Sequence, residues 1–489
     1  MFYLFSHFNC SDIFLVIIAF SIILLYEIIN GFHDSANAIA TVIYTHALNS
    51  RLAVITSGIF NFLGVMFGGL SVAYAIVHLL PIDLLLNIHS LYGLKAIFSM
   101  LCAAMLWNLC TWIFGLPTSS SHTLIGTIIG INISYAISNH LSIINTFNFS
   151  KLLNVFLSLI ISPILGLILS GCLVFILKFF FRNNKKFHYV NMTTKDTHPP
   201  FLVRITLILS SMGVSYSHGA NDGQKGIGLI MLVLICIFPS GYFVNLNFTQ
   251  YDIAKVKNSI LCFQKYYEDN KSNLKVSTYM IQDHIKKIKL EKNFKSPEKN
   301  ILYIFQDVYK LLKNILSYKE LSIDQRCKLR QELLCISEYI EIINQNFNIS
   351  SDDKHFLKNL KKNLLSSIEY APMWIIALVA LSLSFGTMIG WKKIVTTFGE
   401  KIGRKNMTYI QAISSQLTAA ISIGTASYTG IPVSTTHIVA SSITGTILVN
   451  GDEIQMRTIK NIVVSWILTF PVSIILSSIL YWISLELAS

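Results

Sequence analysis

The sequence has few charged residues for its length. Asp, Glu, Lys and Arg make up 13% of its 489 residues, whereas 53% are hydrophobic, and the mean hydropathy is +0.57. A typical soluble domain carries about twice this share of charge. The composition therefore excludes an ordinary soluble protein and predicts an all-α integral membrane protein with several spans.

The eight cysteines have no spacing typical of a metal or redox site. Cys102 and Cys110 lie in apolar sequence, and Cys327 and Cys335 are too far apart along a predicted helix to form a bridge. The first apolar run also lacks a basic start and a small-residue cleavage site, since it follows Asp12 and continues through the motif at 31–37. We expect no structural disulfide, no cofactor, and a retained first helix rather than a signal peptide.

The net charge of +13 is concentrated in a few segments. Residues 251–370 contain 21 Lys or Arg and 15 Asp or Glu, which is 36 of the chain's 63 charged residues. The remaining basic clusters, 178–204 and 392–405, adjoin apolar runs, as cytoplasmic anchors of membrane helices do. This distribution indicates contact with lipid and does not indicate a nucleic-acid partner. It places both clusters inside the cell, and both chain ends and residues 245–370 outside.

Apolar runs long enough to span a bilayer, about 20 residues each, begin near eight positions: Ile13, Leu52, Lys95, Leu152, Arg204, Ala371, Met407 and Ile462. We interpret the chain as a first membrane repeat at 1–181, a basic cytoplasmic linker at 182–203, the start of a second repeat at 204–244, a polar insertion at 245–370, and the rest of the second repeat at 371–489. Periodicity at 301–316 and 329–343 predicts that the insertion is helical.

Two polar motifs interrupt the apolar sequence, and each occurs twice. GFHDSAN at 31–37 returns as GANDGQK at 219–225, and GLPTSSSH at 115–122 returns as GIPVSTTH at 430–437. Such duplication predicts two repeats of about five membrane segments each, inserted in opposite orientations, with broken helices or hairpins at the centre. If the second motif pair is re-entrant, the charge argument for the orientation loses its support.

The first motif pair places a carboxylate within apolar sequence in each half. An ionised carboxylate at membrane depth is costly unless a partner compensates it. Each Asp follows a glycine by three residues, where we expect the helix to be interrupted and carbonyl groups to be freed. The pair indicates a cation or proton site, with a helix cap or an internal salt bridge as the alternative for either residue alone. The candidate coupling residues are Asp34, Asn37, Asn221, Asp222 and Lys225.

Three further polar residues adjoin these motifs, namely Glu27, His33 and Gln224. Glu27 is interpreted either as a second carboxylate on the transport path or as a paired structural residue. His33 and Gln224 either line the path or satisfy backbone groups at the interruptions.

The second motif pair places hydroxyl groups beside a proline. Gly and Pro at a helix start leave backbone N–H groups unpaired at the positive end of the helix dipole. Two such starts facing each other would surround a tetrahedral oxyanion such as phosphate, whereas ordinary helix capping is the alternative. The candidate phosphate-binding residues are Ser119, Ser120, Ser121, Ser434, Thr435 and Thr436. His122 and His437 end the two elements and are candidates for pH sensitivity, with hydrogen-bonded packing as the alternative.

One position distinguishes the two halves. The first half has Asn37 where the second has Lys225, so a neutral side chain is replaced by a fixed positive charge. We interpret Lys225 as taking the electrostatic role of a bound cation near Asp222, or as helping to hold an anion. Pairing with Asp222 for stability alone is the alternative.

With these motifs assembled, the sequence resembles the inorganic phosphate transporter (PiT) family, and within it the bacterial low-affinity phosphate permeases. The resemblance rests on residues 31–38, 115–123, 217–226 and 430–437, in that order, and extends to EYAPMW at 369–374. It implies a symporter of the inner membrane, not an enzyme. It also assigns Asp34, Asn37 and Asp222 to cation coupling, and the Ser/Thr residues of the second motif pair to phosphate.

The resemblance implies secondary active uptake of inorganic phosphate, in bacteria commonly with protons and as a neutral metal–phosphate complex, and elsewhere with sodium. The family motif has Asn where this chain has Lys225, which favours protons over sodium. Sodium-coupled phosphate transport, or transport of another oxyanion such as sulfate, stays open. An intramembrane hydrolase would need a catalytic constellation, and no His-Glu-x-x-His motif occurs. The partners considered are phosphate, a proton or sodium ion, a divalent metal carried with phosphate, lipid, and a second copy of the chain as a homodimer.

Overall fold

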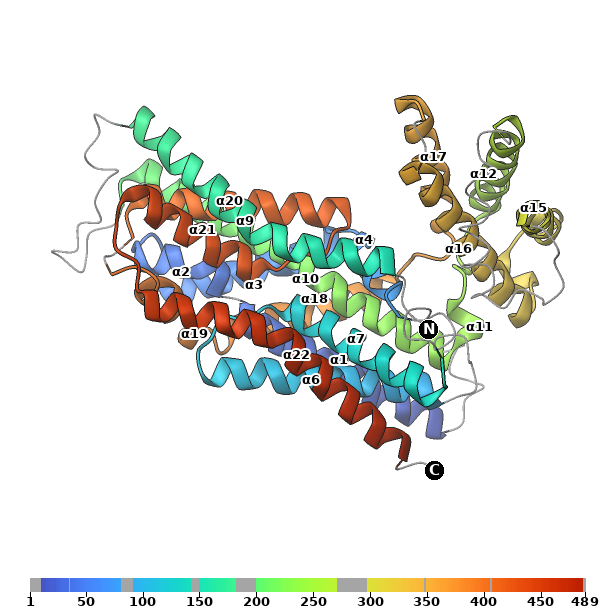
Figure 1. Cartoon of the computed structure of the whole chain (residues 1–489), viewed down its shortest axis with the longest axis horizontal. Coiled ribbons are helices and arrows are strands. Elements are labelled where there is room, and N and C mark those ends of the chain that lie inside the picture. The colour runs from blue at the N-terminus through green and yellow to red at the C-terminus, as the bar shows by residue number, and fades with distance from the viewer. Residues whose placement is uncertain are drawn as a thin grey trace. The chain divides into compact units, whose positions relative to one another are not determined.

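A computed structural model describes residues 10–34, 36–80, 91–141, 149–181, 199–270, 297–346, 349–404 and 407–486. Within these ranges every named element is a helix (Figure 1). The chain divides into two compact units. The membrane unit comprises residues 13–84, 89–233 and 371–489, and the insertion unit comprises residues 1–12, 85–88 and 234–370. The all-α fold predicted from the composition is confirmed.

The helices of the membrane unit are α1 (Cys10–Asp34), α2 (Ala36–Tyr44), α3 (Ser50–Phe67), α4 (Ser71–Val77), α6 (Leu91–Ile113), α7 (Ser120–Ser138), α9 (Phe149–Phe180), α10 (Phe201–Ile237), α18 (Met373–Met388), α19 (Lys392–Thr396), the π-turn η4 (Thr397–Lys401), α20 (Tyr409–Thr429), α21 (Thr435–Asn450) and α22 (Met456–Glu486). The first residues of α1 and the last of α10 belong to the insertion unit.

Six helical segments in the described ranges are long and apolar enough to cross a membrane, or seven if the bent pair α18 and α19–η4 counts as one span. The protein is therefore a multi-pass membrane protein. The number is smaller than the ten crossings expected if each Ser/His run crosses twice. The reason is that α7 and α21 do not qualify as spans and begin at a buried site between helices, while α20 carries buried polar residues such as Gln411 and Gln416.

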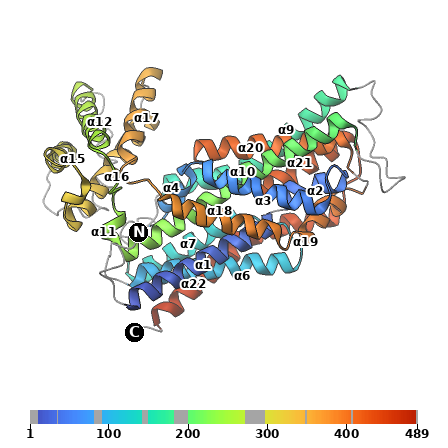
Figure 2. The same ribbon diagram turned by 180° about the vertical axis from the view of Figure 1, so that it is seen from behind.

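The helices of the membrane unit pack in matched pairs (Figures 1 and 2). The helix that follows the first Ser/His motif, α7, packs against α22, and its counterpart α21 packs against α9. Between these pairs α3 packs against α18. Each half-length helix therefore lies against the final helix of the other half.

The glycines of the first motif pair have a different role from the one expected. The structure shows α10 as continuous from Phe201 to Ile237, so the interruption predicted at Gly219 is wrong. A Cβ atom added to Gly219 would lie 2.2 Å from the backbone oxygen of Asn61 on α3. In the first half, a Cβ atom on Gly31 would lie 2.4 Å from the backbone oxygen of Leu383 on α18. Both glycines allow two helix backbones to approach closely, as small residues do in membrane bundles.

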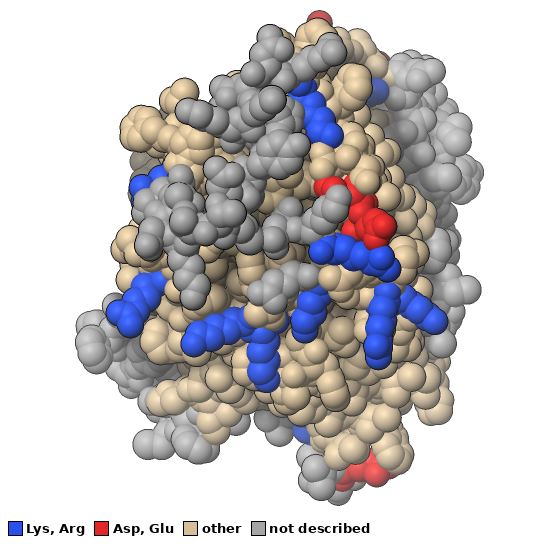
Figure 3. Space-filling view, turned by 90° about the vertical axis from the view of Figure 1, so that its left-hand side faces the viewer, with Lys and Arg blue, Asp and Glu red and all other residues tan. Residues whose placement is uncertain are grey.

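Lysine and arginine side chains gather at one end of the membrane unit (Figure 3). The chain reaches this end at the C-terminus of α9, the N-terminus of α10, and α19 with η4. The described basic residues of these segments are Lys178, Arg204, Lys392, Lys393, Lys401 and Arg404. The described ends of both basic clusters thus belong to segments that reach this end, and most of the linker at 182–203 is outside the described residues.

The insertion unit has its own hydrophobic core. Its helices after α10 are α11 (Pro239–Tyr242), α12 (Gln250–Asp269), α15 (Pro297–Leu312), η3 (Tyr318–Glu320), α16 (Ile323–Asn346) and α17 (Ser351–Leu365). Phe263, Phe305 and Tyr339 pack edge to face in this core. Arg330 donates to the carbonyl groups of Phe243 and Ile368, at 3.0 and 3.1 Å, and so ties the two ends of the segment together. The segment therefore folds around its own core, and its two ends lie close together.

Candidate functional site

Two helix N-termini of the same construction meet inside the membrane unit. Gly115 and Gly430 adopt positive φ angles of 66° and 75°, which turn the chain before α7 and α21. Ser119 and Ser434 then cap the helices, each side chain accepting from the backbone N–H of the histidine three residues on at 3.1 Å. The prolines lie in the extended segments before the caps and not in the first helical turn, which the sequence favoured, because the serines already fix where each helix begins.

The hydroxyl groups that follow the caps donate to the two carboxylates. Ser120 Oγ lies 3.0 Å from Asp34 Oδ2 and 3.5 Å from Asp222 Oδ2. Thr435 Oγ1 lies 3.4 Å from Asp222 Oδ2, and Thr436 Oγ1 donates to Asp34. The structure therefore brings both motif pairs, and both halves of the chain, to one place.

The two asparagines predicted to take part also lie here. Asn37 Nδ2 is 3.3 Å from Thr436 Oγ1 and 3.5 Å from Asp34 Oδ1. Asn221 Nδ2 donates to Asp222 Oδ1 and to the carbonyl oxygen of Val433, each at 3.2 Å. The Asn37 amide therefore connects Asp34 to the second half of the chain, whereas the Asn221 amide connects Asp222 to the segment before α21 within the second half.

Lys225 is a fully buried cation at the edge of this cluster. Its Nζ atom lies 2.6 Å from Asp222 Oδ1 and 2.6 Å from Ser121 Oγ. Ser121 in turn donates to the carbonyl oxygen of Val433 at 2.8 Å. The lysine therefore links a carboxylate to the hydroxyl-bearing segment of the other half, and Asn37 is the neutral residue at its counterpart.

His218 is a site residue that the sequence reasoning missed. Its Nε2 atom lies 3.2 Å from Asp222 Oδ2 and 3.9 Å from Asp34 Oδ2, and its Nδ1 atom is 2.9 Å from Asn61 Oδ1. His218 precedes Asp222 by four residues, one helical turn, and this spacing could have revealed it. Ligand atoms of Asp34, His218 and Asp222 all lie within 4.8 Å of one another, so the three residues could hold a cation. The sequence predicted no metal site.

His33 connects the cluster to a second group of hydroxyls. Its Nε2 atom lies 3.1 Å from Thr118 Oγ1 and 3.4 Å from Thr111 Oγ1, while its Nδ1 atom is 3.6 Å from Asp34 Oδ1. Thr118 belongs to the first Ser/His motif but was not predicted to take part.

The remaining predicted residues lie around the site. His122 and His437 pack ring to ring, with centroids 4.3 Å apart, and His437 stacks on Trp466. Gln224 faces the start of α4, where its Oε1 atom accepts from the backbone N–H of Val72 at 2.7 Å. Glu27 is buried two turns before Asp34 on α1. Gln224 thus satisfies backbone groups in this structure, which was one of the two alternatives.

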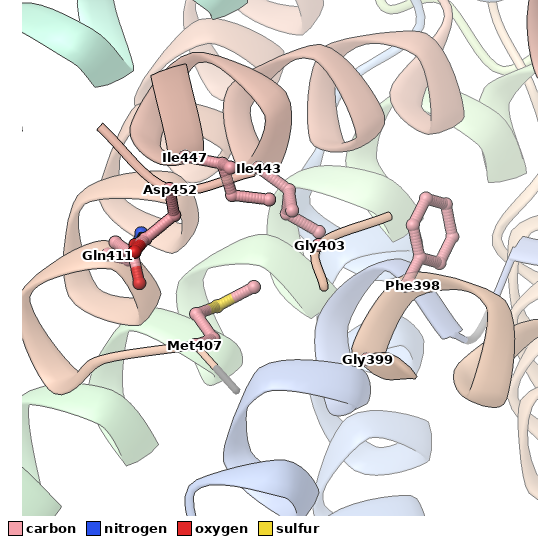
Figure 4. Close-up of a pocket in the computed structure, with 8 residues that line it drawn as sticks. All are labelled: Phe398, Gly399, Gly403, Met407, Gln411, Ile443, Ile447 and Asp452. Atoms are coloured by element: carbon pink, nitrogen blue, oxygen red, sulfur yellow. Dashed lines mark hydrogen bonds between the residues drawn. The ribbon is translucent and has the colours of Figure 1, made fainter. Parts of the chain in front are cut away.

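The carboxylate cluster is closed to solvent in this structure. Asp222, Lys225 and Asn221 have no exposed surface, and Asp34 is 1% exposed. A cavity of about 10 Å³, about the room that one water needs, lies elsewhere in the membrane unit, beside η4 (Figure 4). It is lined by Phe398, Gly399, Gly403, Met407, Gln411, Ile443, Ile447 and Asp452. Gln411 Nε2 donates to Asp452 Oδ2 across its rim at 3.0 Å.

Known proteins are similar to this chain in sequence and in fold. The profile described as the phosphate transporter family matches residues 30–477. The low-affinity inorganic phosphate transporter of Buchnera aphidicola subsp. Acyrthosiphon pisum (strain APS) is 54% identical over 495 residues, which cover all of both chains. The low-affinity inorganic phosphate transporter PitA of Escherichia coli (strain K12) is 48% identical over 497 residues, covering 99% of this chain and 100% of the relative.

A solved structure described as the sodium-dependent phosphate transporter is similar to this fold. It has a TM-score of 0.54 and 19% sequence identity, and the match covers 97% of this chain and 99% of that one. At this identity the likeness concerns the fold alone. The family profile and the two relatives settle the class of the protein, because they cover nearly the whole chain. This chain belongs to the phosphate transporter family and is a multi-pass membrane transporter of phosphate, not an enzyme.

Proposed function

We propose that the protein is a symporter of the bacterial inner membrane that imports inorganic phosphate with protons. The observation that carries this proposal is the position of Lys225, whose Nζ atom lies 2.6 Å from Asp222 and 2.6 Å from Ser121. A fixed ammonium group there supplies, from the protein itself, the positive charge that a sodium ion would otherwise bring between a carboxylate and phosphate. A proton remains as the ion that can be bound and released on each cycle.

The phosphate site in this proposal consists of the N-termini of α7 and α21. Ser120, Thr435 and Thr436 donate to carboxylates in the described structure, and the same hydroxyls can donate to phosphate oxygens when the two helix starts move apart. The helix dipoles favour an anion at this place. Two ionised aspartates would repel it, so at least one cation has to accompany the phosphate.

A divalent metal carried with phosphate is the second part of the proposal. The carboxylates of Asp34 and Asp222 and the imidazole of His218 converge beside the hydroxyl groups. Oxygen and nitrogen ligands of this kind suit a divalent cation that also binds phosphate oxygens. Sodium is the competing occupant, because the similar solved structure is described as a sodium-dependent transporter.

The arrangement of helices supports two inverted repeats that alternately expose this site. In Figure 1 α7 and α21 run from the site toward opposite ends of the membrane unit. Each packs against the last helix of the other half. An inverted pair of half-helices around a central site is how several transporter folds alternate between two faces.

The basic end of the membrane unit is proposed to face the cytoplasm. Positive residues are enriched on that side of membrane proteins, and Figure 3 shows lysine and arginine side chains gathered on one face. A cysteine introduced for the exposed Arg404 should react with a membrane-impermeant maleimide in inside-out vesicles and stay unlabelled in intact spheroplasts.

Uptake by purified protein in liposomes tests the coupling ion. Labelled phosphate should accumulate when the outside is acidic relative to the lumen, with no sodium present, and an imposed sodium gradient alone should give no accumulation. Including magnesium or manganese, and following the metal as well as the phosphate, tests the complex. Accumulation that needs sodium and ignores the pH gradient would overturn proton coupling.

A further inference from the structure

Glu27 is a buried carboxylic acid outside the carboxylate cluster. It has no exposed surface, and among the described residues neither of its carboxyl oxygens accepts a hydrogen bond of regular geometry; the nearby Asn30 amide interacts with it only weakly. Its counterpart in the second half, Ser215, is satisfied by hydrogen bonds to Ser57 and to the carbonyl group of Ser211. An ionised carboxylate without a donor is costly at membrane depth. These surroundings therefore tolerate the protonated form of Glu27.

The Glu27 side chain lies against α10 at Gly226, the residue that follows the buried lysine. A Cβ atom added to Gly226 on α10 would be 2.6 Å from Glu27 Oε1, so the carboxyl group rests against the α10 backbone next to Lys225. The titratable and charged groups that face it from α10 are Lys225, Asp222 and His218, and Tyr26 adjoins it on α1. Lys225 is the lysine among these groups, and its ammonium group contacts Asp222.

The Lys225 ammonium group can therefore pair with either of two carboxyl groups, that of Asp222 or that of Glu27. In this structure it contacts Asp222 and Ser121, both at 2.6 Å. A long flexible side chain can swing its ammonium group by several ångströms. If Glu27 loses its proton, its charge attracts Lys225 away from Asp222, and Ser121 loses the cation beside the phosphate site.

We propose that Glu27 binds the transported proton, and that Lys225 relays its protonation state to the phosphate site. With Glu27 neutral, Lys225 stays with Asp222 and Ser121 and supports phosphate binding. With Glu27 ionised, Lys225 moves to it, and phosphate is released. The proton is taken from water on the side of phosphate entry and is given to water on the side of release. This inference rests on the proposed proton coupling.

The experiment compares net transport with exchange for the full chain in liposomes. Wild type, Glu27→Gln, Glu27→Asp and the control Glu332→Gln, which alters a buried carboxyl of the insertion unit, are reconstituted in parallel. One assay follows labelled phosphate driven by an imposed pH gradient. The other follows exchange of external labelled phosphate for internal unlabelled phosphate at equal pH.

In Glu27→Gln, net driven uptake should fall by about tenfold or more, a coupling free energy of about 1.4 kcal/mol. Exchange should persist and lose its dependence on pH, because the amide imitates the protonated acid. Glu332→Gln should match the wild type in both assays. Normal gradient-driven uptake by Glu27→Gln overturns the inference, and so does the loss of exchange in a folded variant, since that shows a structural role.

Two further results keep the inference separate from the function on which it rests. If the wild type itself ignores the pH gradient, proton coupling fails, and Glu27 has no proton to carry. If Glu27→Gln cannot be recovered folded, Glu27→Asp decides. Its carboxyl group is one methylene shorter and farther from Lys225, so the pH profile of its driven uptake has to shift, and an unchanged profile contradicts the inference.

Discussion

The two halves of the membrane unit share a scaffold and differ in charge. Ser119 and Ser434 cap α7 and α21 in the same way, and Gly31 and Gly219 bring helix pairs together in the same way. In contrast, Asp34 has the amide of Asn37 beside it, whereas Asp222 has the ammonium group of Lys225. The duplicated glycines and caps thus build the site in both halves, and we expect the unmatched residues to determine which cation works there.

The largest effects are expected at the two aspartates. Asp34→Asn and Asp222→Asn should both abolish gradient-driven phosphate uptake, because each removes a charge that a cation needs. Only Asp222→Asn should also destabilise the protein strongly, by about 3–5 kcal/mol, because Lys225 then stays buried without its counter-ion. Thermal unfolding in detergent measures this difference. Adding Lys225→Met to Asp222→Asn should restore stability without restoring uptake.

Equal loss of stability in the two single variants would contradict this asymmetry. It would mean that Lys225 draws its compensation from other groups, and that the contact with Asp222 is not the one that matters.

Making the second half resemble the first is the next test. Lys225→Asn removes the fixed cation, so proton-driven uptake should fall about tenfold, within the usual range of coupling free energies, and added sodium should stimulate what remains. Uptake under imposed sodium and proton gradients measures the change. Lys460→Asn, which removes an exposed lysine at the start of α22, is the matched control and should behave as wild type. Unchanged ion dependence and affinity in Lys225→Asn would end the proposed role of Lys225.

Replacing the paired glycines by alanine should destabilise the two halves to a similar extent. Gly31→Ala and Gly219→Ala each force a methyl group against backbone, at 2.4 and 2.2 Å, and overpacking of this kind costs about 1–3 kcal/mol. Gly213→Ala on the same helix as Gly219 is the control, since its nearest neighbour is the Ala420 methyl group at 3.3 Å. The apparent melting temperature should fall for the first two variants and stay near wild type for the third. Tolerance of alanine at only one of the paired positions would break the match between the halves.

The sequence predicted the membrane class and the starts of α7 and α21 because these depend on patterns within single segments, whereas the meeting of the motifs followed from their duplication. Apolar runs indicate spans, and a Ser directly before a helical run indicates a helix cap. A capping pattern is local, so the starts of α7 and α21 could be placed to within a few residues.

Contacts between distant segments were harder to predict. Gly219, three residues before Asp222, is compatible with an interrupted helix or with close packing. The structure decides for packing, because a Cβ atom on Gly219 would lie 2.2 Å from the backbone oxygen of Asn61. His218 was overlooked for the same reason, since its partners Asn61 and Asp34 come from other helices. The sequence also left open whether each Ser/His run crosses the membrane twice, because hydropathy alone does not reveal that α7 and α21 begin at buried polar residues.

The smallest predicted effect concerns the insertion, which the second half has and the first lacks. Burial, followed by the neighbouring Asp307 carboxyl, raises the pKa of Glu332 from 4.5 to about 9. Between about pH 5 and about pH 9, Glu332 keeps its proton in the folded protein and releases it in the unfolded chain. The stability of the insertion unit should therefore fall as the pH rises through this range. Hydrogen exchange of α16 in the full chain, corrected for intrinsic rates, measures this trend.

Glu332→Gln should flatten this pH dependence, because an amide does not titrate. The control Asp324→Asn changes an exposed carboxylate in the first turn of the same helix, and its pH dependence should follow the wild type. Phosphate uptake should be the same in both variants, because the insertion unit contributes no residue to the proposed site. If Glu332→Gln retained the wild-type pH dependence, the proton would have to reside on another group of the unit, and the partnership of Lys328 with Asp307 would be the next to alter.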